Sequence, residues 1–415
     1  MRYFFSLFIT TVLFPGIFVS SAQKDIAPPE TIKSIQIGSL NENNLLVPFV
    51  PLHGILYLSF DDLEADEKDY YYKIDHLDKD WNLSELNTTE YITGYEQERI
   101  TEYENSFNTL QDYTHYRLSI PNEYTRIKIS GNYRISILND DDEIVFTRHF
   151  VVYEPLLTVG VSLHRSRDVS KLETHQSVHF VIDHKNFRID NPGAEIHPVI
   201  IRNNNFRTAI TGLSPQFIRQ GQLIYKYDRE TAFAGGNEFW NFDTKDIYNT
   251  NMSVARIIQG NDLYHAYLFT DRDRSNDAYT YYPDINGNFV IRTVNDDNSR
   301  TGADYLWVHF SLEVPENFDR EVYIYGAFND YQLNNTNRMH KNAENGLYEA
   351  AILLKQGFYN YTYVIPDDGK VDDTALNGSH EETENEYTVL VYYTKAGSYY
   401  DRVIGIGKGS SSNLH

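Results

Sequence analysis

Apolar and polar residues alternate along most of the chain. Clear examples are the segments 54–60 (GILYLSF), 133–138 (YRISIL) and 357–365 (GFYNYTYVI). A period of two places every second side chain on the same face of a β-strand, so the pattern predicts sheets with one buried face. Turn residues separate these segments, for example at 139–142 and 284–288. Because the sequence lacks long segments with a period of 3.6 residues, we expect an all-β protein made of β-sandwiches rather than βαβ units.

Two breaks divide this pattern into three modules. A proline in Tyr153-Glu154-Pro155 follows a strand-like segment, and proline removes a hydrogen-bond donor from a sheet. The second break is the polar, turn-rich segment 295–302 (NDDNSRTG). We therefore expect three consecutive immunoglobulin-like or early-set sandwiches, at residues 26–154, 155–300 and 301–408.

The N-terminus has the pattern of a secretory signal peptide over residues 1–22. Arg2 precedes an apolar run, and Ser20 and Ala22 are the small residues expected before a cleavage site between Ala22 and Gln23. A membrane anchor is the alternative, but Pro15 and Gly16 interrupt the run. After Gln23 the sequence has no stretch approaching the roughly 18 apolar residues of a spanning helix. We expect an exported chain without direct membrane insertion.

Composition narrows the possible partners and chemistries. The chain has 34 Tyr and 23 Phe, which supply enough apolar surface for a folded core. Its formal charge of −23 repels phosphate backbones, so nucleic acid is not expected as a partner. The absence of cysteine excludes disulfides, thiolate metal sites, a cysteine nucleophile and a lipidated-cysteine anchor.

Motif searches find no catalytic, metal or cofactor site in the sequence. His175, His179 and His184 are close in sequence but lack the spacing of a zinc site. The segment 284–288 (DINGN) begins like a calcium loop, but Thr293 stands where the bidentate Glu is required, so a hairpin turn is the better interpretation. Whether an Asp-rich loop binds calcium stays open. We expect no enzyme activity, no cofactor, no metal and no small-molecule ligand.

Two aromatic segments are candidate contact surfaces. Phe239 and Trp240 follow a Gly-Gly pair and can either anchor a partner or pack in the core. The segment 322–331 (VYIYGAFNDY) resembles glycogen-binding early-set sandwiches, in which an aromatic residue near Phe328 and Asn329 stacks on sugar rings. Tyr331 takes that position in place of the usual tryptophan, and no tryptophan follows the later Asp368-Gly369 turn. The resemblance implies the fold of the last module more firmly than it implies sugar binding.

A larger set of motifs, in one order along nearly the whole mature chain, resembles the type IX secretion system plug protein family of Bacteroidota. They include Trp81 in 80–82 (DWN), 103–116 (YENSFNTLQDYTHY), 131–133 (GNY), 239–247 (FWNFDTKDI), 284–292 (DINGNFVIR), 303–312 (ADYLWVHFSL), 326–329 (GAFN), 354–357 (LKQG) and 382–393 (ETENEYTVLVYY).

The family resemblance implies a non-enzymatic protein of the periplasm. Its partner would be the large outer-membrane β-barrel of the translocon, which would hold it at the outer membrane and whose periplasmic opening it would reversibly seal. The alternative is a periplasmic or secreted glycan-binding protein that uses Tyr331 of the C-terminal sandwich.

Overall fold

The computed structural model describes residues 25–41 and 45–414. Almost every regular element in this part of the chain is a strand, which confirms the all-β prediction. Short helical turns are α1 (Thr88–Tyr91), α2 (Pro192–Glu195), α3 (Ser299–Gly302), η1 (Val169–Lys171), η2 (Ala327–Asn329) and η3 (Ser411–Asn413). None of the described helices is long and apolar enough to cross a membrane. The expected cleavage site at Ala22 and Gln23 lies outside the described residues.

The first sandwich contains strands β1 to β12. One sheet has the order β2 (Leu46–Val47), β1 (Ile32–Leu40), β4 (Leu56–Asp62), β9 (Thr114–Ile120) and β8 (Glu102–Asn105). The facing sheet has the order β3 (Phe49–Pro51), β12 (Ile144–Tyr153), β11 (Gly131–Leu138), β5 (Tyr71–Leu77) and β7 (Gln97–Arg99), while β6 (Ile92–Thr93) pairs with β10 (Arg126–Ile127). Alternate aromatic residues meet between the sheets, and Phe60, Tyr116 and Phe150 are buried there.

The second sandwich joins the middle of the chain to its C-terminus. Its first sheet has the order β13 (Thr158–Arg165), β14 (His175–Asp183), β18 (Gln222–Tyr225) and β17 (Phe217–Arg219), with β19 (Ala232–Ala234) also paired to β14. Its second sheet has the order β16 (Asn205–Ile210), β15 (Ile196–Arg202), β31 (Glu386–Tyr393) and β32 (Arg402–Ser410). Phe180 and Tyr387 are among the residues buried between the two sheets.

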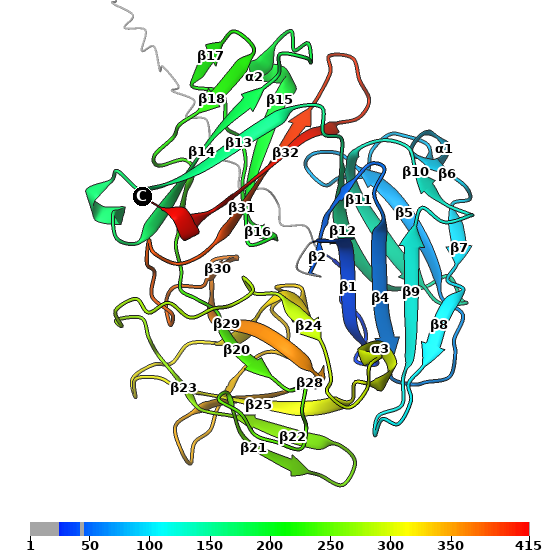
Figure 1. The fold of residues 1–415 in the computed structure, drawn as a ribbon, viewed down its shortest axis with the longest axis vertical. Coiled ribbons are helices and arrows are strands. Elements are labelled where there is room, and N and C mark those ends of the chain that lie inside the picture. The colour runs from blue at the N-terminus through cyan, green and yellow to red at the C-terminus, as the bar shows by residue number, and fades with distance from the viewer. Residues whose placement is uncertain (1–24, 42–44, 415) are drawn as a thin grey trace, which may run out of the picture.

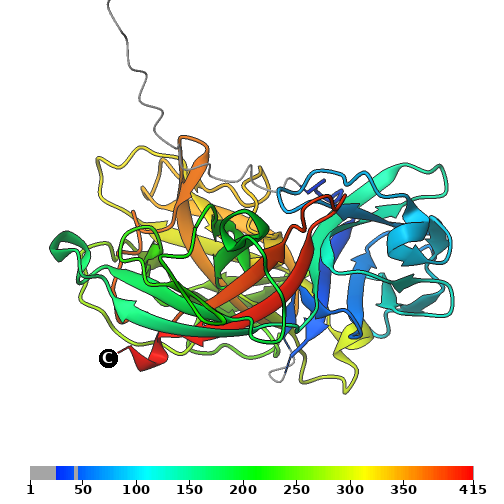
Figure 2. The ribbon, with the colours of Figure 1, turned by 90° about the horizontal axis from the view of Figure 1, so that it is seen from above.

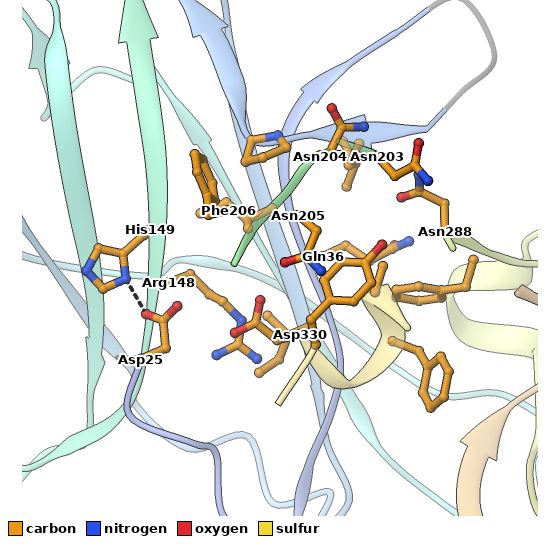
Figure 3. Close-up of a pocket in the computed structure, with 18 of the residues that line it drawn as sticks. Asp25, Gln36, Arg148, His149, Asn203, Asn204, Asn205, Phe206, Asn288 and Asp330 are labelled. Carbon is orange, nitrogen blue, oxygen red and sulfur yellow. Dashed lines mark hydrogen bonds and ion pairs between the residues drawn. The ribbon is translucent and has the colours of Figure 1, made fainter. Parts of the chain in front are cut away.

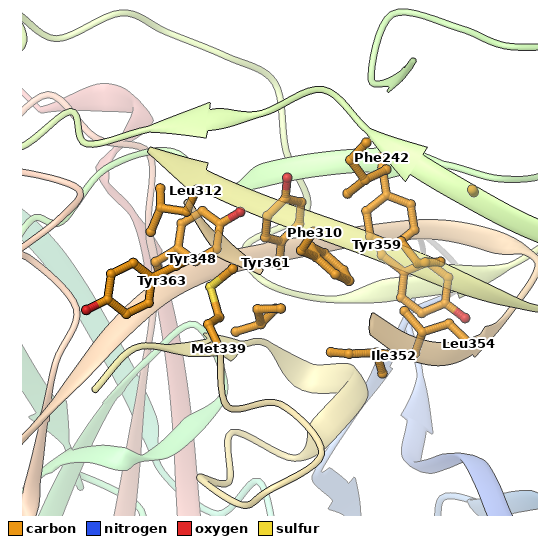
Figure 4. Close-up of a cluster of buried hydrophobic side chains, with 14 of the residues drawn as sticks. Phe242, Phe310, Leu312, Met339, Tyr348, Ile352, Leu354, Tyr359, Tyr361 and Tyr363 are labelled. Carbon is orange, nitrogen blue, oxygen red and sulfur yellow. The ribbon is translucent and has the colours of Figure 1, made fainter. Parts of the chain in front are cut away.

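The third sandwich is built from the residues between β19 and β31. In one sheet β29 (Gly357–Asp367) pairs with β20 (Trp240–Asp243), β24 (Phe289–Ile291), β26 (Tyr323–Tyr325) and β30 (Lys370–Asp372). The other has the order β21 (Val254–Gln259), β22 (Tyr264–Leu268), β25 (Tyr305–Glu313), β28 (Tyr348–Lys355) and β27 (His340–Lys341), with β23 (Asp271–Arg272) paired to β25. Figure 4 shows the aromatic core between them, in which the rings of Phe242 and Tyr359 stack at 5.2 Å.

The expected division into modules 155–300 and 301–408 is therefore wrong, because the third sandwich is inserted into the second. Strands β20 and β24 precede the expected boundary but pair with β29, which follows it. Strand β31 pairs with β15, although the two strands lie about half the chain apart in sequence. Ile196 lies opposite Tyr393 at one end of this pairing, and Arg202 lies opposite Tyr387 at the other. The polar segment 295–302 is not a linker: it contains α3 and packs on the first sandwich. Local composition marks turns, whereas these pairings depend on contacts far apart in the sequence.

The three sandwiches occupy the corners of a triangle (Figure 1). The first lies beside both others, and the view from above shows the same neighbours (Figure 2). Each pair of sandwiches shares buried contacts, so their junction is the place where the whole chain meets.

Candidate functional site at the junction of three sandwiches

A buried ion pair joins the first sandwich to the third. Lys355 Nζ lies 2.7 Å from Asp61 Oδ2, and the two side chains are 1% and 0% exposed. Tyr305 Oη donates to the same carboxylate at 2.6 Å, and His115 Nδ1 lies 2.5 Å from Asp61 Oδ1. The ammonium group also lies 4.0 Å from the ring centroid of Tyr113. Such a pair is stable only when further hydrogen bonds satisfy both groups, as they do here.

The ion pair keeps its charges because each partner compensates for the burial of the other. Burial opposes ionisation of Asp61, but Lys355 and His115 hold the pKa of this carboxyl below its usual value. Burial lowers the pKa of Lys355, and Asp61 opposes that change. The arrangement fixes the relative position of two sandwiches by a charged contact that neither could bury alone.

An apolar cluster joins the first sandwich to the second. Phe49 and Val151 of the first pack with Ile201, Leu390 and Tyr392 of the second. The hydroxyl of Tyr392 donates to Asn132 Oδ1 at 2.7 Å, so its polar end is satisfied within the interface. This contact is continuous with the ring of Trp81, one of the motif residues, which lies 5.2 Å from that of Phe206.

Polar contacts dominate between the second and third sandwiches. Arg202 pairs with Asp373, and Asn205 donates to the hydroxyl of Tyr325 at 3.3 Å. Both connections between these sandwiches pass this region, where the amide of Asn237 donates to the carbonyl of Asn377 at 2.7 Å. The two chain crossings and these side chains together resist bending at the insertion.

A cavity of about 130 Å³ lies where the three sandwiches meet (Figure 3). Its polar lining comes from all of them and includes Gln36 and Arg148, Asn203 to Asn205, and Asn288 and Asp330. Burial raises the pKa of Asp330, with Arg148 opposing the shift. On the other side of Arg148, Asp25 Oδ1 lies 2.7 Å from His149 Nδ1. The polar groups converge on the cavity and tie the start of the described chain to it.

The residues expected to contact sugar lie in this junction. The ring of Tyr331 packs at 5.1 Å against Tyr325, and its hydroxyl lies where a side chain at Gly287 would clash. Phe328 packs edge-on against Tyr359 at 5.8 Å, and Asn329 donates its amide to the carbonyl of Ile324 at 2.8 Å. All three side chains thus hold the third sandwich together or contact its neighbours, and they do not form an open stacking platform.

The backbone at Tyr331 has an unusual conformation. Asp330 and Tyr331 have φ values of 54° and 52°, in the left-handed region that an aromatic residue rarely adopts. Such strain persists only where surrounding contacts enforce it. Here the contacts are the hydrogen bond from Tyr331 N to Gly326 O at 3.0 Å and the packing described above.

Phe239 and Trp240, the other candidate contact residues, pack at the edge of the third sandwich. Phe239 N donates to Asp284 Oδ2 at 2.6 Å, while Trp240 lies under the guanidinium of Arg274 at 4.4 Å. Both side chains are half-buried, and a role in partner binding stays a prediction.

The segment 284–288 forms a turn, but the expected hairpin is wrong, because the strand that follows, β24, pairs with the distant β29. Asp284 Oδ1 accepts from Asn286 N at 2.7 Å and Oδ2 accepts from Phe239 N, so both oxygens bind backbone. Asn286 and Gly287 have positive φ values of 53° and 81°. Burial raises the pKa of Asp284 to about 7, with the backbone hydrogen bonds opposing it.

Sequence motifs did not identify one acidic group that the structure brings together. Asp62, Glu64 and Asp66 place carboxylate oxygens within 4.8 Å of one another. Among the described residues, this is the group of acidic side chains close enough together to hold a metal ion. The ammonium of Lys68 lies among them, 3.3 Å from Asp62. This lysine supplies the positive charge that the cluster requires.

The ion pair Asp61–Lys355 was also missed, although part of it lies in segments that carry the family resemblance. Tyr113, Tyr305 and Lys355 belong to the motifs 103–116, 303–312 and 354–357. These three motif residues therefore gather at the contact between the first and third sandwiches. This grouping was the available signal, but it becomes visible only in three dimensions.

Comparison with known proteins supports the resemblance. Residues 32–154 match the family described as the type 9 secretion system plug protein 1st domain. A crystal structure of a hypothetical protein from Parabacteroides merdae ATCC 43184 is 33% identical, with a TM-score of 0.89. The match covers 93% of this chain and 98% of that one. No curated protein matches the sequence.

Proposed function

We propose, from the premise that residues 32–154 match the first domain of the type 9 secretion system plug protein family, that the chain reversibly seals the periplasmic opening of the outer-membrane translocon. The observation that carries the proposal is the match of its whole first sandwich to the first domain of that family. The proposed role is mechanical and non-enzymatic. The proposed location is the periplasm, where the chain is held at the outer membrane by the translocon barrel.

The architecture suits a stopper because the three sandwiches are locked to one another. A body that closes a wide opening must resist bending when it is pressed from one side. The buried pair Asp61–Lys355 and the apolar cluster around Tyr392 supply two such locks, and the insertion of the third sandwich into the second supplies a third. A chain of sandwiches joined end to end by flexible linkers would lack this stiffness.

Reversibility requires that the released form stays soluble. A formal charge of −23 keeps copies of the protein apart after release. The interface with the barrel should then be of moderate size, with a few aromatic anchors and a polar rim.

The glycan-binding alternative has less support. It assigned sugar stacking to Tyr331, whose ring packs on Tyr325 inside the junction. A sugar would have to displace contacts that hold the third sandwich together beside the junction.

Affinity purification tests the proposal directly. A tagged chain, expressed in its own host and extracted under mild conditions, should copurify with the very large outer-membrane barrel of the secretion system. Overloading the pore with a cargo protein that cannot complete export should reduce the recovery, because cargo and stopper compete for one opening. If the barrel is present in the extract but absent from the purified fraction with and without cargo, the proposal is wrong.

A further inference from the structure

The outer face of the β21–β22–β25–β28 sheet carries an unusual set of side chains. In register across the four strands lie Ile258, His265, Trp307 and Leu353, and the neighbouring row is Arg256, Tyr267, His309 and Ala351. We call these two rows the β25 face. Trp307 and Ile258 are 36% and 41% exposed, and Phe269, which follows β22, is 56% exposed.

The core of the third sandwich does not account for these residues. Leu306, Val308 and Phe310 alternate with the two outward positions of β25 and are almost completely buried. An outward position on such a sheet normally carries a polar side chain. The outer face of β13 in the second sandwich follows that rule, with Thr158, Gly160 and Ser162 exposed.

The same sheet face is already an interface at one end. Tyr305 and Lys355 lie one step along β25 and β28 from Trp307 and Leu353, and the first sandwich covers them completely. There an aromatic ring and a cation receive the carboxylate of Asp61. The β25 face continues this surface beyond the edge of the first sandwich, where Arg256, Ile258 and Trp307 are exposed.

The open part of the surface repeats the same chemistry. The guanidinium of Arg256 lies 4.3 Å over the ring of Tyr267, and His309 stacks on that ring at 4.2 Å. Within the described residues, Arg256 has no carboxylate within ion-pair distance. An unpaired cation beside an exposed tryptophan is complementary to an apolar surface that carries an acidic residue.

We propose that the β25 face is the surface by which this chain docks on an apolar, acidic patch at the rim of the translocon barrel. The inference rests on the proposed function and names the surface that performs it. Trp307 provides the buried anchor, and Arg256 receives a carboxylate of the barrel. The chain carries a net charge of −23, so most of its surface repels an acidic rim. Arg256 attracts the rim, and this difference fixes the orientation in which the chain docks.

Site-specific crosslinking tests this surface, since the chain contains no cysteine. A single cysteine in place of Ile258, which lies on the β25 face and is 41% exposed, is labelled with a photoactivatable maleimide. It is compared with a cysteine in place of Ser162, which is exposed on the outer face of β13. Each full-length protein is added to outer-membrane extract from a strain that lacks the chain. We expect an adduct with the barrel, identified by mass spectrometry, from Ile258→Cys and not from Ser162→Cys.

Substitutions then test the two proposed anchors. Trp307→Ala and Arg256→Glu should each lower the adduct yield of Ile258→Cys by about tenfold or more, as expected for interface hot spots. Trp307→Phe should retain most of it. Phe217→Ala and Arg219→Glu make matched changes at exposed positions of β17 and should leave the yield unchanged. Unchanged urea midpoints show that each variant is folded.

The outcomes separate this inference from the proposed function. If the wild-type chain copurifies with the barrel but Ile258→Cys and Ser162→Cys give equal yields, the β25 face is not the docking surface while the stopper role stands. Adducts between two copies of the chain would instead assign the face to self-association and overturn the inference. If the wild-type chain does not associate with the barrel, both proposals fail.

Discussion

Removal of the buried cation tests the lock between the first and third sandwiches. In Lys355→Met the apolar stem is retained, but Asp61 loses its charge partner and the carbonyl of Arg300 loses a donor at 2.6 Å. Asp61 still accepts from Tyr305 and remains near His115, although its own side chain is fully buried. Breaking a buried ion pair from one side costs about 3 to 5 kcal/mol, and we expect a loss of free energy of unfolding within that range.

Urea unfolding followed by tryptophan fluorescence measures this loss. Trp81 lies at the contact between the first and second sandwiches, and Trp240 and Trp307 report on the third. We expect the midpoint of Lys355→Met to fall. The transition should also broaden or split, because the third sandwich loses its coupling to the first.

A matched control uses an exposed pair in the first sandwich. Lys73 Nζ lies 2.5 Å from Glu96 Oε1, with side chains 34% and 62% exposed, and Lys73→Met should cost no more than about 1 kcal/mol. The double variant Asp61→Asn with Lys355→Met should recover part of the loss, since it leaves no uncompensated charge. If Lys355→Met and Lys73→Met lower the midpoint equally, the buried pair is not a lock and the reasoning is refuted.

Three further predictions follow from individual sites. Burial raises the pKa of Asp271 to about 6, with hydroxyl donors from Tyr361 and Tyr363 opposing. The folded chain therefore binds this proton more tightly than the unfolded chain, so the free energy of unfolding declines as the pH rises from about 4 to 6. In urea titrations, Asp271→Asn should raise the free energy of unfolding by about 1 to 3 kcal/mol at pH 8 and by less at pH 5. Equal gains at the two pH values would contradict this prediction. Tyr331→Ala should lower the free energy of unfolding by about 2 kcal/mol through lost packing. The wild-type protein should give no calorimetric signal with a maltooligosaccharide, and millimolar or tighter binding would restore the glycan alternative. Removal of divalent cations by chelation should leave the urea midpoint unchanged, because Lys68 already neutralises the Asp62 group, and a lowered midpoint would show a bound metal.

Local patterns sufficed for the strands but not for their partners. The alternation in 357–365 predicts β29 because a period of two places successive side chains on opposite faces of one strand, and both faces of β29 are almost entirely buried. The pairing of β15 with β31 leaves no such mark, since it joins residues about half a chain apart. The inserted position of the third sandwich could not be inferred from composition near residue 300 for the same reason.

The junction of the three sandwiches could not be predicted from the sequence either, because its contacts also join segments that are far apart in the chain. Lys355 occupies an outward position of β28, where alternation predicts exposure, but the first sandwich and the carbonyl of Arg300 cover it. The resemblance to sugar-binding modules predicts an open position for Tyr331, but its neighbours in the junction come from distant segments. Trp307 did carry a local signal in the sequence, because this outward-facing residue is as apolar as its buried neighbours Leu306 and Val308.

The stopper role is tested most directly by the permeability of the outer membrane in a strain that lacks this chain. A missing stopper leaves an open pore without removing the transport machinery. We therefore predict that a clean deletion becomes sensitive to vancomycin while cargo secretion largely continues, and that the wild-type gene restores resistance. Unchanged vancomycin sensitivity, with the barrel shown to be present at its normal level, would contradict the account.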